Sequence, residues 1–345
     1  MARRQRVTIK QVAREAGVSI QTVSRVINER PDVAPETRQR VQEVIERLGY
    51  QPSALARSLI RQRSFTLGVV TAGLVYFGPS RALNGITGQA EEMGYTLLLK
   101  ELPDFDTNDV KPLLDSLLAR QVDGIIWAVP EVGDNRDWIN DRLPELPVPL
   151  IFLTMQKRIG LSIVSIDNYR GGRMAMEHLL EQGYRHIGHI SGPLDWWEAR
   201  QRKEGWQDAL SEAGIRTSER HWVEGTWSSA SGVRGICQLM DQYPEMDAVF
   251  VGNDQMALGV MHVACQKGIQ VPQDLAVVGF DNIPEAAYFW PPLTTVHQDL
   301  NKLGCTAVRE LVEIIETTRR EKVDVEPKAG LLQPELIVRG STVAQ

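Results

Sequence analysis

The chain has very few cysteines. Cys237, Cys265 and Cys305 are the only three among 345 residues, they lie far apart, and no CxxC pair occurs. This spacing argues against a disulfide framework or a structural zinc site and favours free thiols in a reducing compartment. We therefore expect a cytoplasmic protein without a bound metal.

Long apolar runs and export signals are lacking as well. No segment approaches the roughly 20 apolar residues that span a bilayer. Residues 1–10 contain no apolar core of a signal peptide. The sequence therefore predicts a protein that is neither exported nor associated with a membrane.

Motifs of catalysis are also missing. There is no GxGxxG after a strand, no GxxxxGK(S/T), no HExxH and no GxSxG. The acidic residues show no pairing that suits acid–base chemistry. We expect no enzyme activity, no catalytic residues and no cofactor.

Charge is present but unevenly distributed. Residues 1–63 hold 13 Lys and Arg against 6 Asp and Glu, whereas the remainder holds 25 against 38. A basic head on an acidic body is typical of a small nucleic-acid-binding module joined to a larger domain that stays off the DNA.

Residues 8–28 have the pattern of two short helices joined by a tight turn. Thr8 and Gln11 suit a capping box at the start of the first helix, and Gly17 suits its end. Ser19 is a favourable cap for the second helix. The segment predicts a helical hairpin of the helix-turn-helix kind.

The second helix carries the residues that suit base recognition. Gln21, Thr22 and Arg25 lie on the side opposite Val23 and Val26. Gln can bond an adenine edge with two hydrogen bonds, and Arg a guanine edge. An ordinary amphipathic hairpin shows the same pattern, so these residues alone leave both interpretations open.

Two more helices are expected before residue 64. Residues 35–48 carry one apolar stripe and predict a third helix that closes a small core. Pro52 ends it, and residues 53–60 would form about two helical turns, too few to be stable alone in water. Beside a DNA-reading head, such a helix would insert Leu59 into a minor-groove base step.

From residue 65 onward, short apolar runs alternate with amphipathic segments, which predicts parallel doubly wound sheets. The expected strands are 66–71, 95–100, 123–129, 148–153, 186–191, 247–252 and 274–280. The expected helices are 80–93, 109–119, 171–182, 199–213, 229–241, 254–268 and 300–318. The length suits two lobes, with a ligand in the crevice at the carboxyl ends of the strands.

Loops after these strands carry aromatic and hydrogen-bonding side chains. Aromatic faces stack on sugar rings, and Arg, Asn and Asp bond hydroxyl groups, so the set suits a carbohydrate. The candidates are Tyr76, Phe77, Pro79, Trp196, Trp197, Arg202, Trp227, Asn253, Asp254 and Asp281.

The same segments carry a family resemblance. TIKQVAREAGVSIQTVSRVIN, followed by Tyr50, Pro52 and ALARSL, resembles the DNA-binding head and hinge of the lactose-repressor (LacI/GalR) family of bacterial regulators. SGPLxxxxARxRxxGW, NDQMALG, VVGFDN and PPLTTVxQD continue the resemblance through the body in the family order. The resemblance implies an all-α helix-turn-helix head and a body similar to periplasmic sugar-binding proteins, with two doubly wound parallel-sheet lobes joined by three crossings.

The resemblance also implies the DNA contacts. Base contacts fall on Ile20, Gln21 and Arg25, and minor-groove insertion falls on Leu59, with Ala56 close to the groove floor. The full set of expected DNA-binding residues is Thr8, Ser19, Ile20, Gln21, Thr22, Arg25, Asn28, Ala56 and Leu59. Ala34 departs from the family, because it stands where a Ser often caps the third helix.

The effector contacts implied by the resemblance lie in the body. They are Tyr76, Phe77, Pro79, Thr154, Trp196, Trp197, Arg202, Trp227, Asn253 and Asp281. Thr154 stands where the lactose-binding member has a sugar-bonding Asp, which leaves the identity of the sugar open. Trp196 and Trp197 replace small residues, so the pocket is expected to be narrower or to hold a stacked ring.

The implied organisation has four parts. Residues 1–50 form the helix-turn-helix domain, and residues 51–64 form a hinge helix and linker. The first lobe comprises residues 65–166 with about 297–325, and the second comprises 167–296 with about 326–345. No leucine heptad follows, so a dimer is expected rather than a tetramer.

We expect a homodimeric transcriptional repressor that binds a near-palindromic double-stranded operator and responds to a sugar. Two alternatives stay open. The chain could be a sugar-binding or sugar-processing protein without a regulatory role, or a regulator that responds to a purine. The sequence does not give the sign of the effector's action on DNA binding.

Overall fold

The computed structural model of the chain describes residues 7–27, 30–50, 63–105, 107, 109–323 and 325–343. The chain divides into two compact units, residues 1–65 and 66–345, which we call the head and the body. The expected DNA contacts Asn28, Ala56 and Leu59 lie outside the described residues, as do residues 51–62 of the expected hinge.

The described part of the head contains α1 (Ile9–Ala16), α2 (Ile20–Ile27) and α3 (Pro35–Leu48). Thr8 and Gln11 form the predicted capping box, and Gly17 ends α1 in the left-handed conformation with φ of 65°. Ala34 contributes no side-chain cap to α3. The helices enclose a core of small apolar side chains: Val12, Ala13, Ala16, Val23, Val26, Val33, Val41 and Val44.

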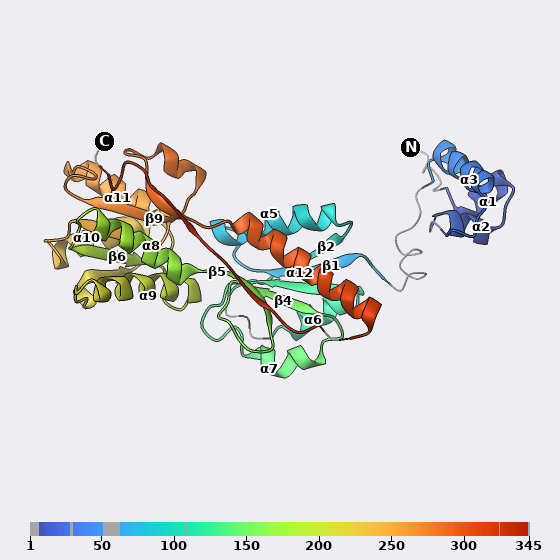
Figure 1. The fold of residues 1–345 in the computed structure, drawn as a ribbon, viewed down its shortest axis with the longest axis horizontal. Coiled ribbons are helices and arrows are strands. Elements are labelled where there is room, and N and C mark those ends of the chain that lie inside the picture. Colours follow the sequence, from blue (N-terminus) through green and yellow to red (C-terminus); the bar gives the residue numbers. More distant parts are fainter. Residues whose placement is uncertain are drawn as a thin grey trace. The chain divides into compact units, whose positions relative to one another are not determined.

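The first lobe of the body is built on a six-stranded parallel sheet with the order β11-β5-β4-β3-β1-β2. Its strands are β1 (Thr66–Thr71), β2 (Thr96–Glu101), β3 (Gly124–Ala128), β4 (Leu150–Leu153), β5 (Ser162–Ile166) and β11 (Ala329–Leu332). Its helices are α5 (Phe77–Glu92), α6 (Lys111–Leu118), α7 (Trp138–Arg142) and α12 (Leu300–Glu321), with the 3₁₀ turn η1 (Leu143–Glu145). Figure 1 shows α5 and α12 on one side of this sheet and α6 and α7 on the other.

The second lobe has a six-stranded sheet with the order β12-β10-β9-β8-β6-β7, parallel except for β12. Its strands are β6 (Ile187–Ser191), β7 (Trp222–Glu224), β8 (Ala248–Val251), β9 (Ala276–Asp281), β10 (Thr294–His297) and β12 (Glu335–Ile337). Its helices are α8 (Asn168–Glu181), α9 (Trp197–Glu212), α10 (Ser229–Gln242) and α11 (Asp254–Lys267), with the 3₁₀ turns η2 (Glu219–His221) and η3 (Pro284–Tyr288). The cores on the two faces of this sheet involve α8 and α9 on one side and α10 and α11 on the other.

Glycines let the helix that carries the candidate site approach its neighbour closely. A Cβ atom at Gly205 in α9 would lie 2.3 Å from the carbonyl oxygen of Tyr169 in α8, and one at Gly172 would lie 2.5 Å from that of Arg202. Only glycine fits such an approach without a shift of backbone. The pair fixes α9 against α8 and therefore fixes the side chains that α9 carries.

Three connections in the described residues join the lobes: β5 to α8, β10 to α12 and β11 to β12. The first and third contact each other, because the backbone N–H of Asp167 donates to the carbonyl of Leu332 at 2.9 Å. The Asp167 side chain also caps α8 by accepting from the N–H of Arg170. Figure 1 shows these strands passing between the two lobes.

Every strand and helix expected in the body is present, with ends shifted by a few residues. Strands β5, β7, β10, β11 and β12 and helix α7 were not expected, and each is five residues or shorter. Strand β11 lies in the first sheet, although residues from about 326 onward were expected in the second lobe. It pairs with β5, which was itself missed, so no pattern pointed to that edge.

No helix within the described residues is long and apolar enough to cross a membrane. Cys237, Cys265 and Cys305 carry free thiols. In the described part of the chain, no cluster of three or more His, Cys, Asp or Glu side chains could hold a metal ion.

Candidate functional site

The exposed side of α2 is the candidate DNA-reading surface of the head. Val23 and Val26 are buried in the head core, whereas Ile20, Gln21 and Arg25 are exposed. The Arg25 guanidinium lies 3.4 Å from the Asp32 carboxylate, and both side chains are more than half exposed. Such a surface pair is worth little, so Arg25 can exchange it for another acceptor.

Thr8 and Ser19, two of the expected DNA contacts, also cap helices in the structure. Thr8 Oγ1 accepts from the N–H of Gln11 at 3.4 Å. Ser19 Oγ accepts from the N–H of Thr22 at 3.0 Å and lies 2.9 Å from its hydroxyl. These bonds fix the first turns of α1 and α2, and the side chains remain at the surface.

The candidate effector site is a cavity of about 390 Å³ within the body, lined by residues of both lobes. It lies at the carboxyl ends of β3, β4 and β9 and at the first turns of α5, α9 and α11. The size is in the range of small-molecule sites. Nine of the ten expected effector residues line it: Tyr76, Phe77, Pro79, Thr154, Trp196, Arg202, Trp227, Asn253 and Asp281.

Trp197 is the exception, because it does not line the cavity. Glu198 and Arg202 are four residues apart on α9 and therefore share one helix face, which lines the cavity. Trp197 directly precedes Glu198 and points elsewhere. Its side chain is buried at the start of α9, and its backbone N–H donates to the backbone carbonyl of Glu131.

Arg202 is buried at the centre of the site. Its Nε donates to Asn168 Oδ1 at 2.8 Å and its Nη1 to the carbonyl of Gly252 at 2.6 Å. Nη1 also lies 3.7 Å from Asp281 Oδ1. The guanidinium carbon stands 3.7 Å from the centroid of the Phe280 ring. These contacts hold one charged plane rigidly beside the cavity.

Asp281 is the acidic partner of Arg202. Burial raises the pKa of Asp281 to about 6, while Arg202 and the Gln298 side chain, which donates to Oδ1, act in the opposite direction. Burial likewise lowers the pKa of Arg202. Burial is the leading cause for both groups, so each depends on the other to stay charged.

Asn253 positions the neighbouring indole. As the cap of α11 its side chain accepts from the N–H of Met256 at 2.9 Å, and its Nδ2 donates to the carbonyl of Trp227 at 3.0 Å. Asp254, the next residue, does not line the cavity. It accepts from the N–H of Ile283 and the hydroxyl of Thr295, which makes it a structural group.

Trp196 connects the two lobes at the edge of the cavity. Its ring contacts Tyr76 and Phe105 of the first lobe, at centroid distances of 5.6 and 4.8 Å, and Trp227 of the second lobe at 5.8 Å. Its backbone forms an antiparallel bridge with Val132. Aromatic and backbone contacts therefore hold the lobes together here.

Three cavity residues have left-handed backbone conformations. Thr154 has φ of 48°, Trp227 of 63° and Asp281 of 107°. Such values are rare outside glycine and clear outliers for a β-branched residue such as Thr. They cluster where a ligand would bind, as stored strain commonly does.

Sequence reasoning missed several polar residues of the cavity: Asn168, Glu198, Thr226, Ser228, Gln255 and Gln298. Glu198 was missed because the helix was expected to begin at residue 199, whereas α9 begins at Trp197. Its spacing of four residues from Arg202 was the available signal. Gln298 follows β10, a strand that was not expected, so nothing marked its position.

Family models of known proteins match both the head and the body. Residues 8–53 match the family model described as bacterial regulatory proteins, lacI family. Residues 176–342 match the periplasmic binding protein-like domain.

Curated relatives extend over nearly the whole chain. Catabolite control protein A of Priestia megaterium is 35% identical over 92% of this chain and 94% of that protein. The lactose operon repressor of Escherichia coli (strain K12) is 34% identical over 89% and 84%. The HTH-type transcriptional repressor PurR of Mannheimia succiniciproducens is 34% identical over 97% and 98%.

Solved structures match as well. The lac repressor dimer bound to operator and the anti-inducer ONPF has a TM-score of 0.87 and 32% identity, covering 99% of this chain and all of that one. The complex of the transcriptional regulator CelR with cellobiose has a TM-score of 0.71 and 32% identity, covering 97% of this chain and all of that one.

Proposed function

The chain belongs to the lacI family of bacterial regulatory proteins, and we propose that it is a homodimeric repressor whose binding to an operator is controlled by a sugar held between its lobes. One observation carries the proposal. A single chain combines a helix-turn-helix head with an exposed polar side on α2 and a body with a cavity between its lobes that polar and aromatic side chains line.

The head would read DNA through α2. Gln21 and Arg25 are exposed on this helix, and both residue types form two hydrogen bonds to base edges in the major groove. Each copy of a dimer would place one head on one half of a near-palindrome. We propose no catalytic activity, because the named relatives are repressors or a control protein.

The role of Arg25 can be tested by Arg25→Ala. We expect operator binding to weaken by about 1–3 kcal/mol and base preference to relax at one position of each half-site. The measurement is selection of bound sequences from random DNA, followed by titration of the preferred operator. Arg40→Ala, which removes an exposed arginine of α3, is the control of equal charge. Uniform weakening over all sequences by Arg25→Ala would assign Arg25 to a phosphate instead.

The cavity chemistry supports a sugar as the effector. Indole and phenol rings of Tyr76, Trp196 and Trp227 can stack on the C–H faces of a pyranose or furanose. Asn168, Gln255 and Gln298 supply amide groups that bond hydroxyls in either direction. Two matched proteins are named for a sugar or its operon: the lactose operon repressor and CelR in complex with cellobiose.

A thermal-shift screen of the purified chain tests this proposal. The panel contains glucose, ribose, lactose and cellobiose, together with hypoxanthine and guanine. A ligand at about 100 times its Kd adds about 2.7 kcal/mol to the stability of the folded state, which shifts the melting temperature visibly. We expect a sugar to bind and to change operator affinity. Binding of a purine alone would replace the sugar proposal and keep the regulator.

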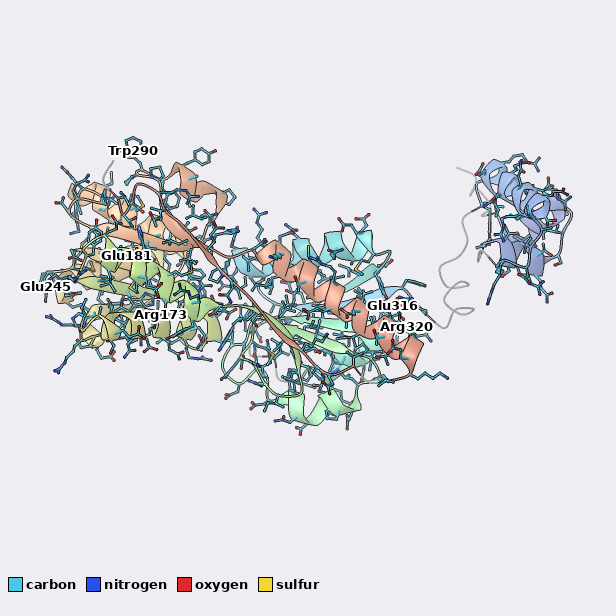
Figure 2. The ribbon with its side chains drawn as sticks, in the orientation of Figure 1. Arg173, Glu181, Glu245, Trp290, Glu316 and Arg320 are labelled. Carbon is cyan, nitrogen blue, oxygen red and sulfur yellow. The ribbon has the colours of Figure 1, made fainter. Side chains whose placement is uncertain are left out.

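A homodimer is supported by apolar side chains left exposed on the second lobe. Leu258, Tyr288 and Trp290 are 46%, 88% and 93% exposed. Figure 2 shows Trp290 at the outer surface of that lobe. If these side chains form one patch, a second copy of the chain is a partner that would cover it. We also propose a cytoplasmic location, which the free thiols and the named operon repressors support.

Effector control requires that the ligand bind two arrangements of the lobes unequally. The lobes are joined by the three connections described above, and Asn168 and Gln298, which belong to two of them, line the cavity. A ligand that bonds these residues would favour one lobe arrangement over another. The same shift would then change the affinity of the dimer for its operator.

A further inference from the structure

The charges that line the cavity are unbalanced. Among the described lining residues, Glu198, Arg202 and Asp281 are charged. Arg202 already has three partners in Asn168, Gly252 and Asp281. An anionic ligand would therefore find no free cation in this lining and would meet a second carboxylate.

Glu198 is the carboxylate without an assigned role. It is 92% buried, since its exposed fraction is 8%. Its Oε2 has almost no solvent-accessible surface and no hydrogen-bond partner among the described residues, so a ligand in the cavity reaches it once the side chain turns toward the cavity. A buried carboxylate oxygen without a partner is costly, and a bound donor would remove that cost.

Trp227, in the same cavity, has a hydrogen-bond donor that needs an acceptor. Its Nε1 is buried and has no acceptor among the residues that the structure describes, and the residue lines the cavity together with Glu198. An indole N–H only donates, and an ionised carboxylate only accepts. A hydroxyl group meets both requirements, because it donates one hydrogen bond and accepts others. A phosphate dianion can accept from Trp227 but cannot donate to Glu198.

We propose that Glu198 is a ligand-binding residue that accepts a hydrogen bond from a sugar hydroxyl and makes the cavity selective for uncharged sugars over their phosphate esters. The inference rests on the proposed sugar effector and specifies its chemical class. Glu198 excludes the phosphate ester by charge repulsion, and an ester formed at the hydroxyl that bonds Glu198 also loses that donor. It selects the free sugar through a charge-assisted hydrogen bond.

The ionisation of Glu198 gives this interaction a pH dependence. Burial raises the pKa of Glu198 to about 7. The charged groups that act on it are Arg202 on α9 itself and Glu131 and Arg136 on the segment after β3. Glu131 is in turn paired with Arg158. A hydroxyl donor favours the ionised form, so sugar affinity should rise as the pH rises through 7, by up to roughly ten-fold between pH 6 and 8.

The test compares the wild-type chain with Glu198→Gln by calorimetry, using glucose with glucose 6-phosphate, ribose with ribose 5-phosphate, lactose and cellobiose. For the wild type we expect a free sugar to bind and its phosphate ester not to bind. Glu198→Gln should weaken the free sugar roughly ten-fold, as expected for the loss of a charged acceptor. It should also remove the rise in sugar affinity that is centred near pH 7 and narrow the difference in affinity between sugar and ester.

Glu204→Gln is the matched control, because Glu204 lies exposed on the same helix, where its carboxylate accepts from the Gln201 side chain. It should leave all affinities unchanged. Folding of Glu198→Gln is checked by its melting temperature. At pH 8 that temperature should equal or exceed the wild-type value, because the variant lacks a buried carboxyl whose raised pKa opposes folding increasingly from about pH 4.5 and fully above about pH 7.

Each outcome decides between the two proposals. Equal sugar affinity in the wild type and Glu198→Gln at every pH overturns the role of Glu198 and leaves the sugar effector standing. A phosphate ester that binds the wild type more tightly than its sugar overturns the selectivity. A wild-type chain that binds none of these sugars overturns both the sugar effector and this inference.

Discussion

Replacing Arg202 by Leu is expected to lower the free energy of unfolding of the body by about 3–5 kcal/mol and to abolish ligand binding. The substitution removes the partner of Asp281 and leaves the carbonyl of Gly252 without its donor. It also leaves Asn168 Oδ1 unpaired. Breaking a buried pair from one side costs more than the pair contributes, because the remaining charge cannot be solvated.

The loss of stability in Arg202→Leu should depend on pH. Asp281 already has its pKa raised by burial to about 6, and Arg202 is the main influence that lowers it. Without Arg202 the pKa of Asp281 rises further above its value in the unfolded chain. Asp281 therefore binds a proton more tightly in the folded variant than in the unfolded chain. The stability deficit should therefore grow as the pH rises. Chemical denaturation followed by circular dichroism at pH 5 and pH 8 measures it.

Two further variants separate electrostatics from packing. Arg202→Leu with Asp281→Asn should recover part of the stability, because the unpaired carboxylate is gone. Arg216→Leu, at an exposed arginine just beyond the end of α9, should change stability by no more than about 0.5 kcal/mol. Equal losses at both pH values, without recovery in the double variant, would contradict the buried-charge explanation.

Trp196→Ala is expected to lower the free energy of unfolding of the body by about 3–5 kcal/mol and to separate the lobes. The indole is 9% exposed and packs on Tyr76 and Phe105 across the cavity edge. Alanine removes the contact of both first-lobe rings with the second lobe at this position. The radius of gyration from small-angle X-ray scattering should increase, and affinity for the sugar identified in the screen should fall at least ten-fold.

Trp196→Phe is the matched variant, because it keeps an aromatic ring at the same place. It should retain most of the stability and a radius of gyration close to that of the wild type. If Trp196→Ala loses stability without any change in dimensions, the indole is a packing residue of the second lobe alone. The proposed link between the lobes would then be wrong.

The head was the most predictable part of the molecule from sequence. Its helix starts and ends depend on neighbouring residues, as in the pair Thr8 and Gln11 and in Gly17. Local rules of capping decide such positions whatever the rest of the chain does. Regular strands such as β1 and β3 were predictable for a similar reason, since buried parallel strands are continuous apolar runs.

The interior of the cavity was less predictable. Strand β10 has the sequence TTVH after two prolines, which reads like a loop, and it becomes a strand only through pairing with β9 and β12. Gln298 follows that strand and was missed with it. Glu198 and Trp197 were misjudged because one residue at a helix start changes which side chain faces the site. Such choices depend on tertiary packing rather than on local pattern.

The left-handed backbones at Thr154, Trp227 and Asp281 restrict how this regulator can acquire a new ligand. Valine or isoleucine at these positions would add β-branched crowding to an unfavourable φ, whereas glycine, asparagine and aspartate tolerate it. Substitutions at these loop positions therefore draw on a small set of residue types. Positions on α9 such as Glu198 have ordinary helical backbone and accept a wider range. Divergence of ligand preference among descendants of this chain should accumulate along the helix before it reaches the strand ends.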